Sequence, residues 1–299
     1  MDIGWVHRQQ CIGFRTDSAS DTVTMVGRTL ADIRDRLSAL SVAVGPYRIV
    51  SARTGTPPFP VSGMQFPDRE TAAEAASVAT AYRSALRRYD PRVTVHGLIV
   101  CEAPWGTDAV RAAPSSLPEY CHTVAGSLFE VLSGRHRSVE QAVIDSYLEA
   151  AEETENRERL CLAMLESMAT ALADNLDPET QADTLREAAG QLPRKPSGPE
   201  PVRDAVADLE TAGLVDETTI EPAAVGPGRC PKYITLGNYR PTLSDYRCPV
   251  LPIAVELLRR TSITPQVAEA ERTADGWRLL VSLAGDRPAE GLSVVTTTA

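Results

Sequence analysis

The sequence predicts a mixed α+β protein built from several parts, and three observations support this. Helical periodicity fills residues 118–192, extended apolar segments occur on both sides of that region, and proline-containing stretches separate the parts. The chain has 299 residues, 43% hydrophobic and 23% charged, which suits two or three domains that each bury a core. We therefore expect a small α-β-β-α-β domain, an antiparallel four-helix domain and a C-terminal α+β part with a β-hairpin.

The first folded part is expected over residues 25–108. Residues 1–24 show no helical or strand periodicity and are expected to form a loose extension, so Met25 is a candidate for the true translation start. Between Leu30 and Leu40 the apolar residues recur at spacings of three and four, which indicates one face of a helix.

Strands and a second helix are expected to follow that first helix. Prolines confine the second strand to an edge or an irregular path, whereas the largely apolar third strand is expected to be central. The second helix is predicted to start at the capping residue Asp68, to carry a stripe of alanines against the sheet, and to end at Asp90-Pro91. The expected strands are residues 46–54, 58–66 and 93–103.

An arginine cluster lies near the end of this second helix. Arg83, Arg87 and Arg88 occupy its last turns, where each positive charge complements the helix dipole by about 0.3–1 kcal/mol. Arg83 and Arg87 are expected to share a face that points away from the alanine stripe. We interpret the cluster mainly as stabilisation of the helix end. The alternative is a binding site for an anion or an acidic partner, with Arg53 as a further cation.

Residues 118–192 carry the most regular pattern, after a linker over residues 109–117. Four amphipathic segments follow one another with short connections, which favours antiparallel helices. Ser138, Asn156 and Asp177 are the expected caps of the second, third and fourth helices, and Pro178 suits the first helical position.

Metal chemistry has little support in this helical region. Glu119 and His122 form an E-x-x-H pair, but a di-iron bundle needs such pairs on facing helices, and only one is present. None of the six cysteines forms a C-x-x-C pair, and Cys161 falls in an apolar helical stretch where a thiol behaves as a small hydrophobe. We expect reduced, buried thiols, no metal and no cofactor.

A proline-rich hinge over residues 193–201 introduces a C-terminal α+β part over residues 202–285. Asp275-Gly276 between two extended runs predicts a β-hairpin, a short helix is expected over residues 249–260, and the tail 286–299 is expected to fray.

The start of this part resembles a winged helix in topology only. Its helix offers Arg203 against Asp204, Asp208 and Glu210, which is the wrong charge for DNA. Nucleic-acid binding is therefore disfavoured, and a transcription regulator with a winged-helix-like part stays an alternative.

Charge and hydropathy indicate the setting in which the chain works. Its net charge is −10, and only Lys195 and Lys232 among the 30 basic residues are lysines. An acidic surface with little lysine is typical of a salt-rich cytoplasm, because exposed carboxylates keep the surface hydrated there. A GC-rich genome accounts for the arginines but not for the excess of acids. No 18-residue apolar run and no signal-peptide pattern occur, so we expect a cytoplasmic protein without a membrane span.

Residues 25–285 resemble a family of uncharacterised proteins from haloarchaea. The segments that carry the resemblance are LADIRDRLSAL, YRIVSARTGTPPFPVSGMQFPDRETAAEAA, AYRSALRRYDPRV, LIVCEAP, CHTVAGSLFEVLS and LCLAMLESMATAL. The resemblance implies a habitat and a domain order and supplies no catalytic residue.

Two classes of function remain open. The sequence has no G-x-G-x-x-G, Walker, G-x-S-x-G or H-E-x-x-H motif, so we expect a non-enzymatic regulator or adaptor whose helical domain binds a protein partner or itself. The alternative is an enzyme with a site at a domain junction, where Cys101, His122 and Arg53 converge.

Overall fold

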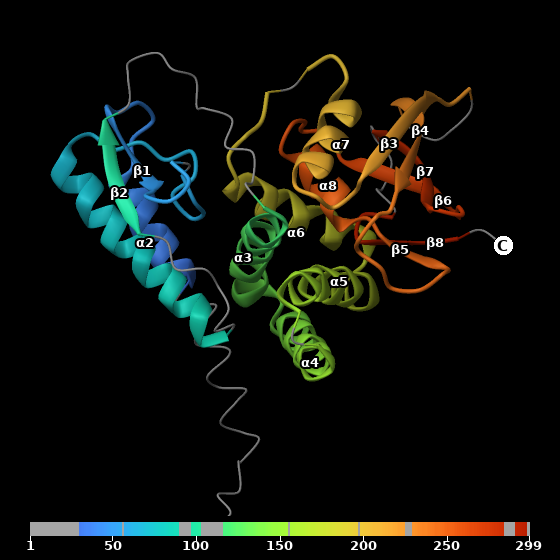
Figure 1. The fold of residues 1–299 in the computed structure, drawn as a ribbon, viewed down its shortest axis with the longest axis horizontal. Helices are drawn as coiled ribbons and strands as arrows, with labels where there is room; N and C mark the ends of the chain where they lie inside the picture. The colour runs from blue at the N-terminus through green and yellow to red at the C-terminus, as the bar shows by residue number, and fades with distance from the viewer. Residues whose placement is uncertain are drawn as a thin grey trace, which may run out of the picture.

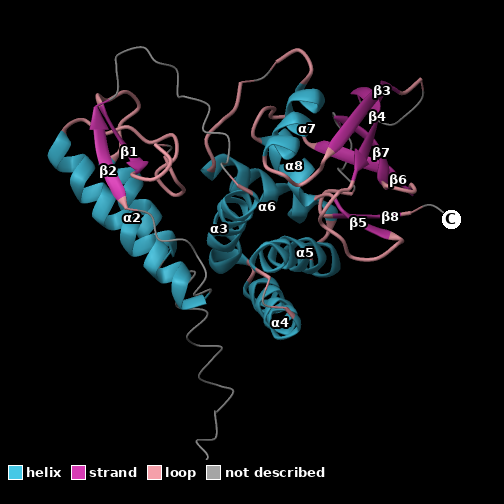
Figure 2. Cartoon of the chain, viewed as in Figure 1, coloured by secondary structure: helices cyan, strands magenta, loops and turns pink. Residues whose placement is uncertain are grey.

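The computed structural model describes residues 30–55, 57–89, 97–102, 116–154, 156–196, 198–224, 229–283 and 291–297. Its elements fall into two parts, which we call the N-terminal unit (described residues 30–102) and the C-terminal unit (described residues 116–297) (Figure 1). Helices and antiparallel strands occur in both, so the expected mixed α+β class is confirmed (Figure 2).

The N-terminal unit has two helices and a two-stranded antiparallel sheet. A helix over residues 30–40 precedes β1 (Tyr47–Ser51), α2 (Arg69–Tyr89) and β2 (Leu98–Glu102). The alanine stripe of α2 lies in the core of the unit as predicted, beside Leu37, Ile49 and Phe66. Asp68 caps α2 as expected, because its carboxylate accepts hydrogen bonds from the amide and the hydroxyl of Thr71 at 2.8 and 2.9 Å.

The expected second strand, residues 58–66, is the main difference from the predicted α-β-β-α-β order. Only Gln65 and Phe66 make single bridges, to Val42 and Tyr47, so the observed order is α-β-α-β. The prolines in this segment cannot donate to a strand ladder, which accounts for the irregular path. Within the described residues β2 pairs with β1 alone, so its expected central position is wrong.

Four helices open the C-terminal unit at nearly the predicted positions, and α3 packs against each of the other three. Asn156 and Asp177 cap their helices as expected, each accepting a hydrogen bond at 3.0 Å from the amide three residues later. The second of these helices begins one residue before the expected cap Ser138, because His136 alone connects it to the first. The helices are α3 (Leu117–Arg135), α4 (Arg137–Glu153), α5 (Arg157–Asn175) and α6 (Pro178–Gln191).

A four-stranded antiparallel sheet in the order β3-β4-β7-β6 follows these helices. The predicted hairpin is confirmed, since β6 and β7 are joined by a turn at Asp275. Gly276 is required there, because a side-chain carbon would clash with the carbonyl of Leu236. The elements are α7 (Pro201–Thr211), β3 (Glu217–Pro222), β4 (Arg229–Gly237), β5 (Arg247–Pro249), α8 (Leu251–Leu258), β6 (Pro265–Arg272), β7 (Gly276–Leu283) and β8 (Val294–Thr296).

The helices and the sheet of the C-terminal unit share one hydrophobic core. Buried side chains from α3 to β8 belong to a single cluster, which includes Leu128, Leu257 and Trp277 and extends to Phe59 and Tyr82 of the N-terminal unit. The cluster spans both sides of residues 193–201, and the division into domains at that segment stays a prediction. Residues 291–297, which were expected to fray, form β8 against β5 and bury Leu292. No helix in the described ranges is both long enough and apolar enough to cross a bilayer.

Candidate functional site

The predicted binding arginines have different environments. Arg83 is buried and its guanidinium donates to the carbonyl oxygen of Phe59 at 2.9 Å, so it does not point away from the core as expected. Arg87 is exposed on α2, Arg53 is exposed in the turn after β1, and the side chain of Arg88 lies outside the described part of the chain. The irregular segment before α2 accounts for the inward direction of Arg83, because the carbonyls of that segment need donors that no strand partner supplies.

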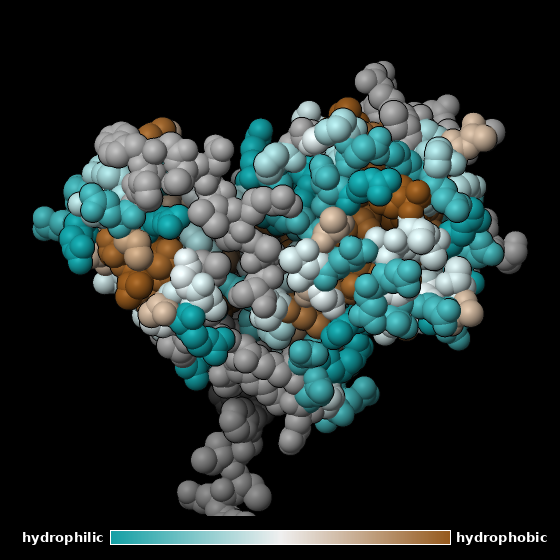
Figure 3. Space-filling model, turned by 45° about the horizontal axis from the view of Figure 1, so that its top comes forward, coloured by the Kyte–Doolittle hydropathy of each residue, from teal (hydrophilic) through white to brown (hydrophobic). Residues whose placement is uncertain are grey.

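The outer face of the β1–β2 sheet is the first candidate site. Side chains alternate along a strand, so Ile49 and Val100 face α2. Arg48, Ile99, Cys101 and the buried Val50 lie on the opposite face, which we call the outer sheet face. Ile99 is 47% exposed, which is unusual for an isoleucine in a strand. Figure 3 shows hydrophobic residues gathered on the surface of the N-terminal unit, at the left of that view.

One cation, Arg48, lies on this face, and Arg53 lies in the turn that follows β1. Arg48 lies directly opposite Cys101, and its Nε is buried and makes no hydrogen bond. Arg53 follows Ala52, whose amide donates to Gly97 at 2.7 Å and extends the pairing of the two strands. In the part of the chain that the structure describes, neither Arg48 nor Arg53 forms an ion pair. The outer sheet face therefore combines an exposed aliphatic side chain with the cation Arg48, which forms no ion pair within the described residues.

The junction between the two units is held by the buried carboxylate of Glu130 on α3. Arg34 Nε lies 3.2 Å from Glu130 Oε2, and the hydroxyl of Tyr82 donates to Oε1. The amide nitrogen of Gln191, oriented toward the carboxylate, lies 3.0 Å from Oε2. Burial raises the pKa of Glu130, and the Arg34 cation and the Tyr82 hydrogen bond oppose this shift.

Aromatic packing closes the same junction. The Arg34 guanidinium lies 4.4 Å from the centre of the Phe59 ring, and Phe59 meets Tyr82 edge to face at 5.6 Å. A side-chain carbon at Gly126 on α3 would come within 2.9 Å of Phe59, so glycine is needed for this close approach. The junction is therefore a specific contact between the units.

A second buried charge cluster lies where residues 193–200 meet α7 and α8. Lys195 Nζ is 2.6 Å from Asp208 Oδ2 and 3.1 Å from Glu256 Oε2. Arg260 binds the same two carboxylates and lies 2.8 Å from Glu256, while Arg259 lies 2.7 Å from the other oxygen of Glu256. Burial lowers the pKa of Lys195 to about 8, and Glu256 partly opposes that shift.

Both lysines of the chain thus hold the proline-rich segment. Lys195 lies within it and binds α7 and α8, and Lys232 on β4 pairs with Glu200 at its other end. An ammonium group is compact and has three donors, which suits Lys195 to two carboxylates at once.

His122 was expected to converge with Cys101 and Arg53, but the cysteine that it contacts is Cys161. His122 Nε2 lies 3.5 Å from the Sγ of Cys161, which joins α3 to α5, whereas Cys101 lies on β2. No spacing in the sequence links residues on two different helices, so sequence reasoning missed this pair. Among the described residues, no group of three or more histidine, cysteine or acidic side chains is placed to hold a metal ion.

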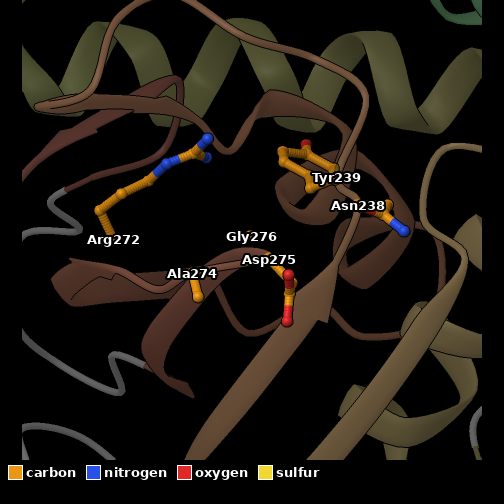
Figure 4. A pocket seen from close by; sticks show the side chains of 6 residues that line it. All are labelled: Asn238, Tyr239, Arg272, Ala274, Asp275 and Gly276. Carbon is orange, nitrogen blue, oxygen red and sulfur yellow. The ribbon is translucent and has the colours of Figure 1, made fainter.

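An open pocket with a volume of about 340 Å³ lies beside the β6–β7 turn, and we call it the turn cavity (Figure 4). Arg272 and Asp275 both contribute to its wall, and both are exposed. The Arg272 guanidinium lies over the buried ring of Trp277, 5.2 Å from its centre. The lining residues are Asn238, Tyr239, Arg272, Ala274, Asp275 and Gly276.

Two family models match the chain, and each coincides with one unit. A domain of unknown function, DUF7551, matches residues 117–298, which is more than half of the chain. The protein belongs to the DUF7551 family. A second domain of unknown function, DUF7552, matches residues 29–104 and thus the N-terminal unit. No curated protein and no solved structure matches the chain. The outer sheet face therefore lies within the residues matched by DUF7552, and the turn cavity lies within those matched by DUF7551.

Proposed function

We propose that this DUF7551 protein is a non-enzymatic adaptor or regulator whose N-terminal unit binds an acidic, apolar segment of a partner protein. The observation that carries the proposal is Ile99, a half-exposed isoleucine on the outer sheet face beside Arg48, a cation with no ion pair among the described residues. Exposed apolar side chains bordered by charge are typical of protein interaction sites.

The chemistry of the partner follows from charge complementarity. The described residues give Arg48 and Arg53 no carboxylate, although the chain as a whole has ten more acids than bases. A partner segment with its own acidic residues supplies the missing charge and covers Ile99 at the same time. In the described part of the sheet β2 has β1 as its only neighbour, so an extended segment can add as a further strand beside β2.

The Glu130 junction would let an adaptor hold its bound partner in a fixed position. It fixes the N-terminal unit to α3, so a partner on the outer sheet face is held at a set position relative to the C-terminal unit. The other candidate roles have less support. The helix α7 exposes both Arg203 and Glu210 and uses Asp208 in the buried cluster, which does not favour DNA.

We further propose that the protein works in a salt-rich cytoplasm, as its acidic, lysine-poor composition indicates. Repulsion among 40 acidic residues is screened by salt, because the Debye length falls from about 30 Å at 0.01 M to about 3 Å at 1 M. We expect the melting temperature to rise between dilute buffer and molar KCl, and equal melting temperatures would contradict the proposal.

A peptide-binding experiment tests the adaptor role. Three short labelled peptides in which valine alternates with glutamate, serine or lysine are titrated into the full chain, and binding is followed by fluorescence anisotropy in molar KCl. We expect the glutamate peptide to bind most tightly. In the double variant Arg48→Glu, Arg53→Glu the preference should change to the lysine peptide. Equal affinity for all three peptides, or no binding of any, would contradict the proposal.

A further inference from the structure

The turn cavity has walls whose shape is set by the backbone. Asn238 adopts a left-handed conformation with φ 50°, and its amide donates to the carbonyl of Asp275 at 2.6 Å. Its side-chain amide donates to Asp216 at 3.1 Å, and Tyr239 donates to the carbonyl of Pro249 at 2.8 Å. These bonds fix both sides of the cavity before any ligand binds, which lowers the entropy cost of binding.

Two opposite charges line this cavity and do not neutralise each other. Arg272 and Asp275 make no ion pair with each other or with any other described residue. The Trp277 ring covers one face of the Arg272 guanidinium and leaves its N–H edge free to donate. Figure 4 shows Arg272 and Asp275 on different sides of the space, with Tyr239 across from Arg272.

The separated charges indicate the class of ligand. A simple anion would pair with Arg272 and meet the Asp275 carboxylate, and a simple cation would have the reverse problem. A small zwitterion with a carboxylate and an ammonium group satisfies both, and a guanidinium can hold a carboxylate through two parallel hydrogen bonds. We propose that the turn cavity binds a free α-amino acid, its carboxylate on Arg272 and its ammonium group on Asp275.

Trp277 provides the readout. It is buried beneath Arg272, and the other two tryptophans of the chain, Trp5 and Trp105, can be changed to phenylalanine so that Trp277 is the only source of indole fluorescence. The twenty L-amino acids are titrated one at a time into this full-length variant at millimolar concentrations. Acetate and methylamine serve as probes that carry only one of the two charges.

The proposal predicts a saturable change in fluorescence with at least one amino acid, and roughly tenfold weaker binding of acetate and methylamine. Arg272→Gln and Asp275→Asn should each abolish saturation while the melting temperature stays the same. Arg278→Gln is the matched control, because Arg278 also stacks on an aromatic ring, that of Tyr233 at 4.1 Å, but lies outside the cavity. Saturation by no amino acid, or acetate binding as tightly as the amino acid and unaffected by Asp275→Asn, would overturn the proposal.

Discussion

The N-terminal unit has a two-stranded sheet with one face packed on α2, whereas the C-terminal unit has a four-stranded sheet in which β4 and β7 are internal (Figure 2). The two units also differ in how many large aliphatic side chains they expose. Val42, Val44 and Ile99 lie in the smaller unit, and Leu148 is the large aliphatic residue exposed in the described part of the larger one. The C-terminal unit instead buries a cluster of five charges. The comparison indicates that the larger unit supplies most of the stability and the smaller one offers a surface for contact.

The largest effect is expected from Glu256→Ala in the buried cluster of the C-terminal unit. Glu256 is fully buried and binds Lys195, Arg259 and Arg260, so its removal leaves Asp208 as the one carboxylate of the cluster. Breaking a buried ion pair costs about 3–5 kcal/mol. We expect a fall of that size in the free energy of unfolding, measured with urea. Glu256→Gln keeps the shape and loses the charge, so its free energy of unfolding should lie between those of the wild type and the alanine variant. A loss under about 1 kcal/mol for the alanine variant would show that the cluster is not a main source of stability.

A smaller effect is expected at the junction between the units. Glu130→Ala leaves Arg34 with the carbonyl of Pro60, to which its Nη1 donates at 3.1 Å, and we expect a cost of about 3 kcal/mol. Tyr82→Phe removes one hydrogen bond to a charged group and should cost about 1.5–3 kcal/mol. Calorimetry should show the units melting together in the wild type and separately in Glu130→Ala. A single transition in both proteins would show that other contacts join the units.

The pH dependence of stability tests the buried cluster around Lys195. Because burial lowers the pKa of Lys195 from 10.5 to about 8, the folded chain has lost a proton between these pH values that the unfolded chain still holds. The unfolded state binds more protons there, so this group makes stability increase with pH from about 8 to 10.5. In Lys195→Met that contribution should vanish, which melting temperatures across this range would detect. Parallel curves for the wild type and Lys195→Met would contradict the assignment.

The helix caps offer a matched pair of small changes. Asp68 in the N-terminal unit and Asp177 in the C-terminal unit each bind the amide and the hydroxyl of a threonine three residues later, at 2.7–3.0 Å. These bonds hold the pKa of both aspartates below the ordinary value, so the stability they give is lost as pH falls through the lowered pKa. Asp68→Ala and Asp177→Ala should lower the melting temperature slightly. Only Asp68→Ala should also weaken peptide binding, because α2 supports the sheet; equal binding by both variants would weaken the comparison.

Local patterns in the sequence predicted the features that depend on near neighbours. The caps at Asp68, Asn156 and Asp177, the four helices α3–α6 and the hairpin at Asp275 all depend on residues a few positions apart. The missed features depend on distant residues. Arg34 and Glu130 are 96 positions apart, and the pairing of β5 with β8 joins segments that flank the β6–β7 hairpin in the sequence.

The candidate sites were harder to predict for the same reason. The charge of Arg53 and the position of Arg83 on its helix were visible in the sequence. That Arg83 turns inward to the Phe59 carbonyl depends on the irregular path of residues 57–64, which no periodicity describes. The exposure of Ile99 was hidden because a largely apolar strand reads as central, although β2 has one strand neighbour in the described sheet.

The affinity of the glutamate–valine peptide for two matched surface variants tests the central claim most directly. Ile99→Asp places a carboxylate on the outer sheet face, and Leu148→Asp makes the same change at a 52% exposed leucine on α4, in the helical region where the sequence first suggested a partner site. If the outer sheet face binds the partner, the dissociation constant should rise roughly tenfold or more for Ile99→Asp and stay within about twofold of the wild type for Leu148→Asp. An unchanged affinity in Ile99→Asp, or a greater loss in Leu148→Asp, would contradict the account.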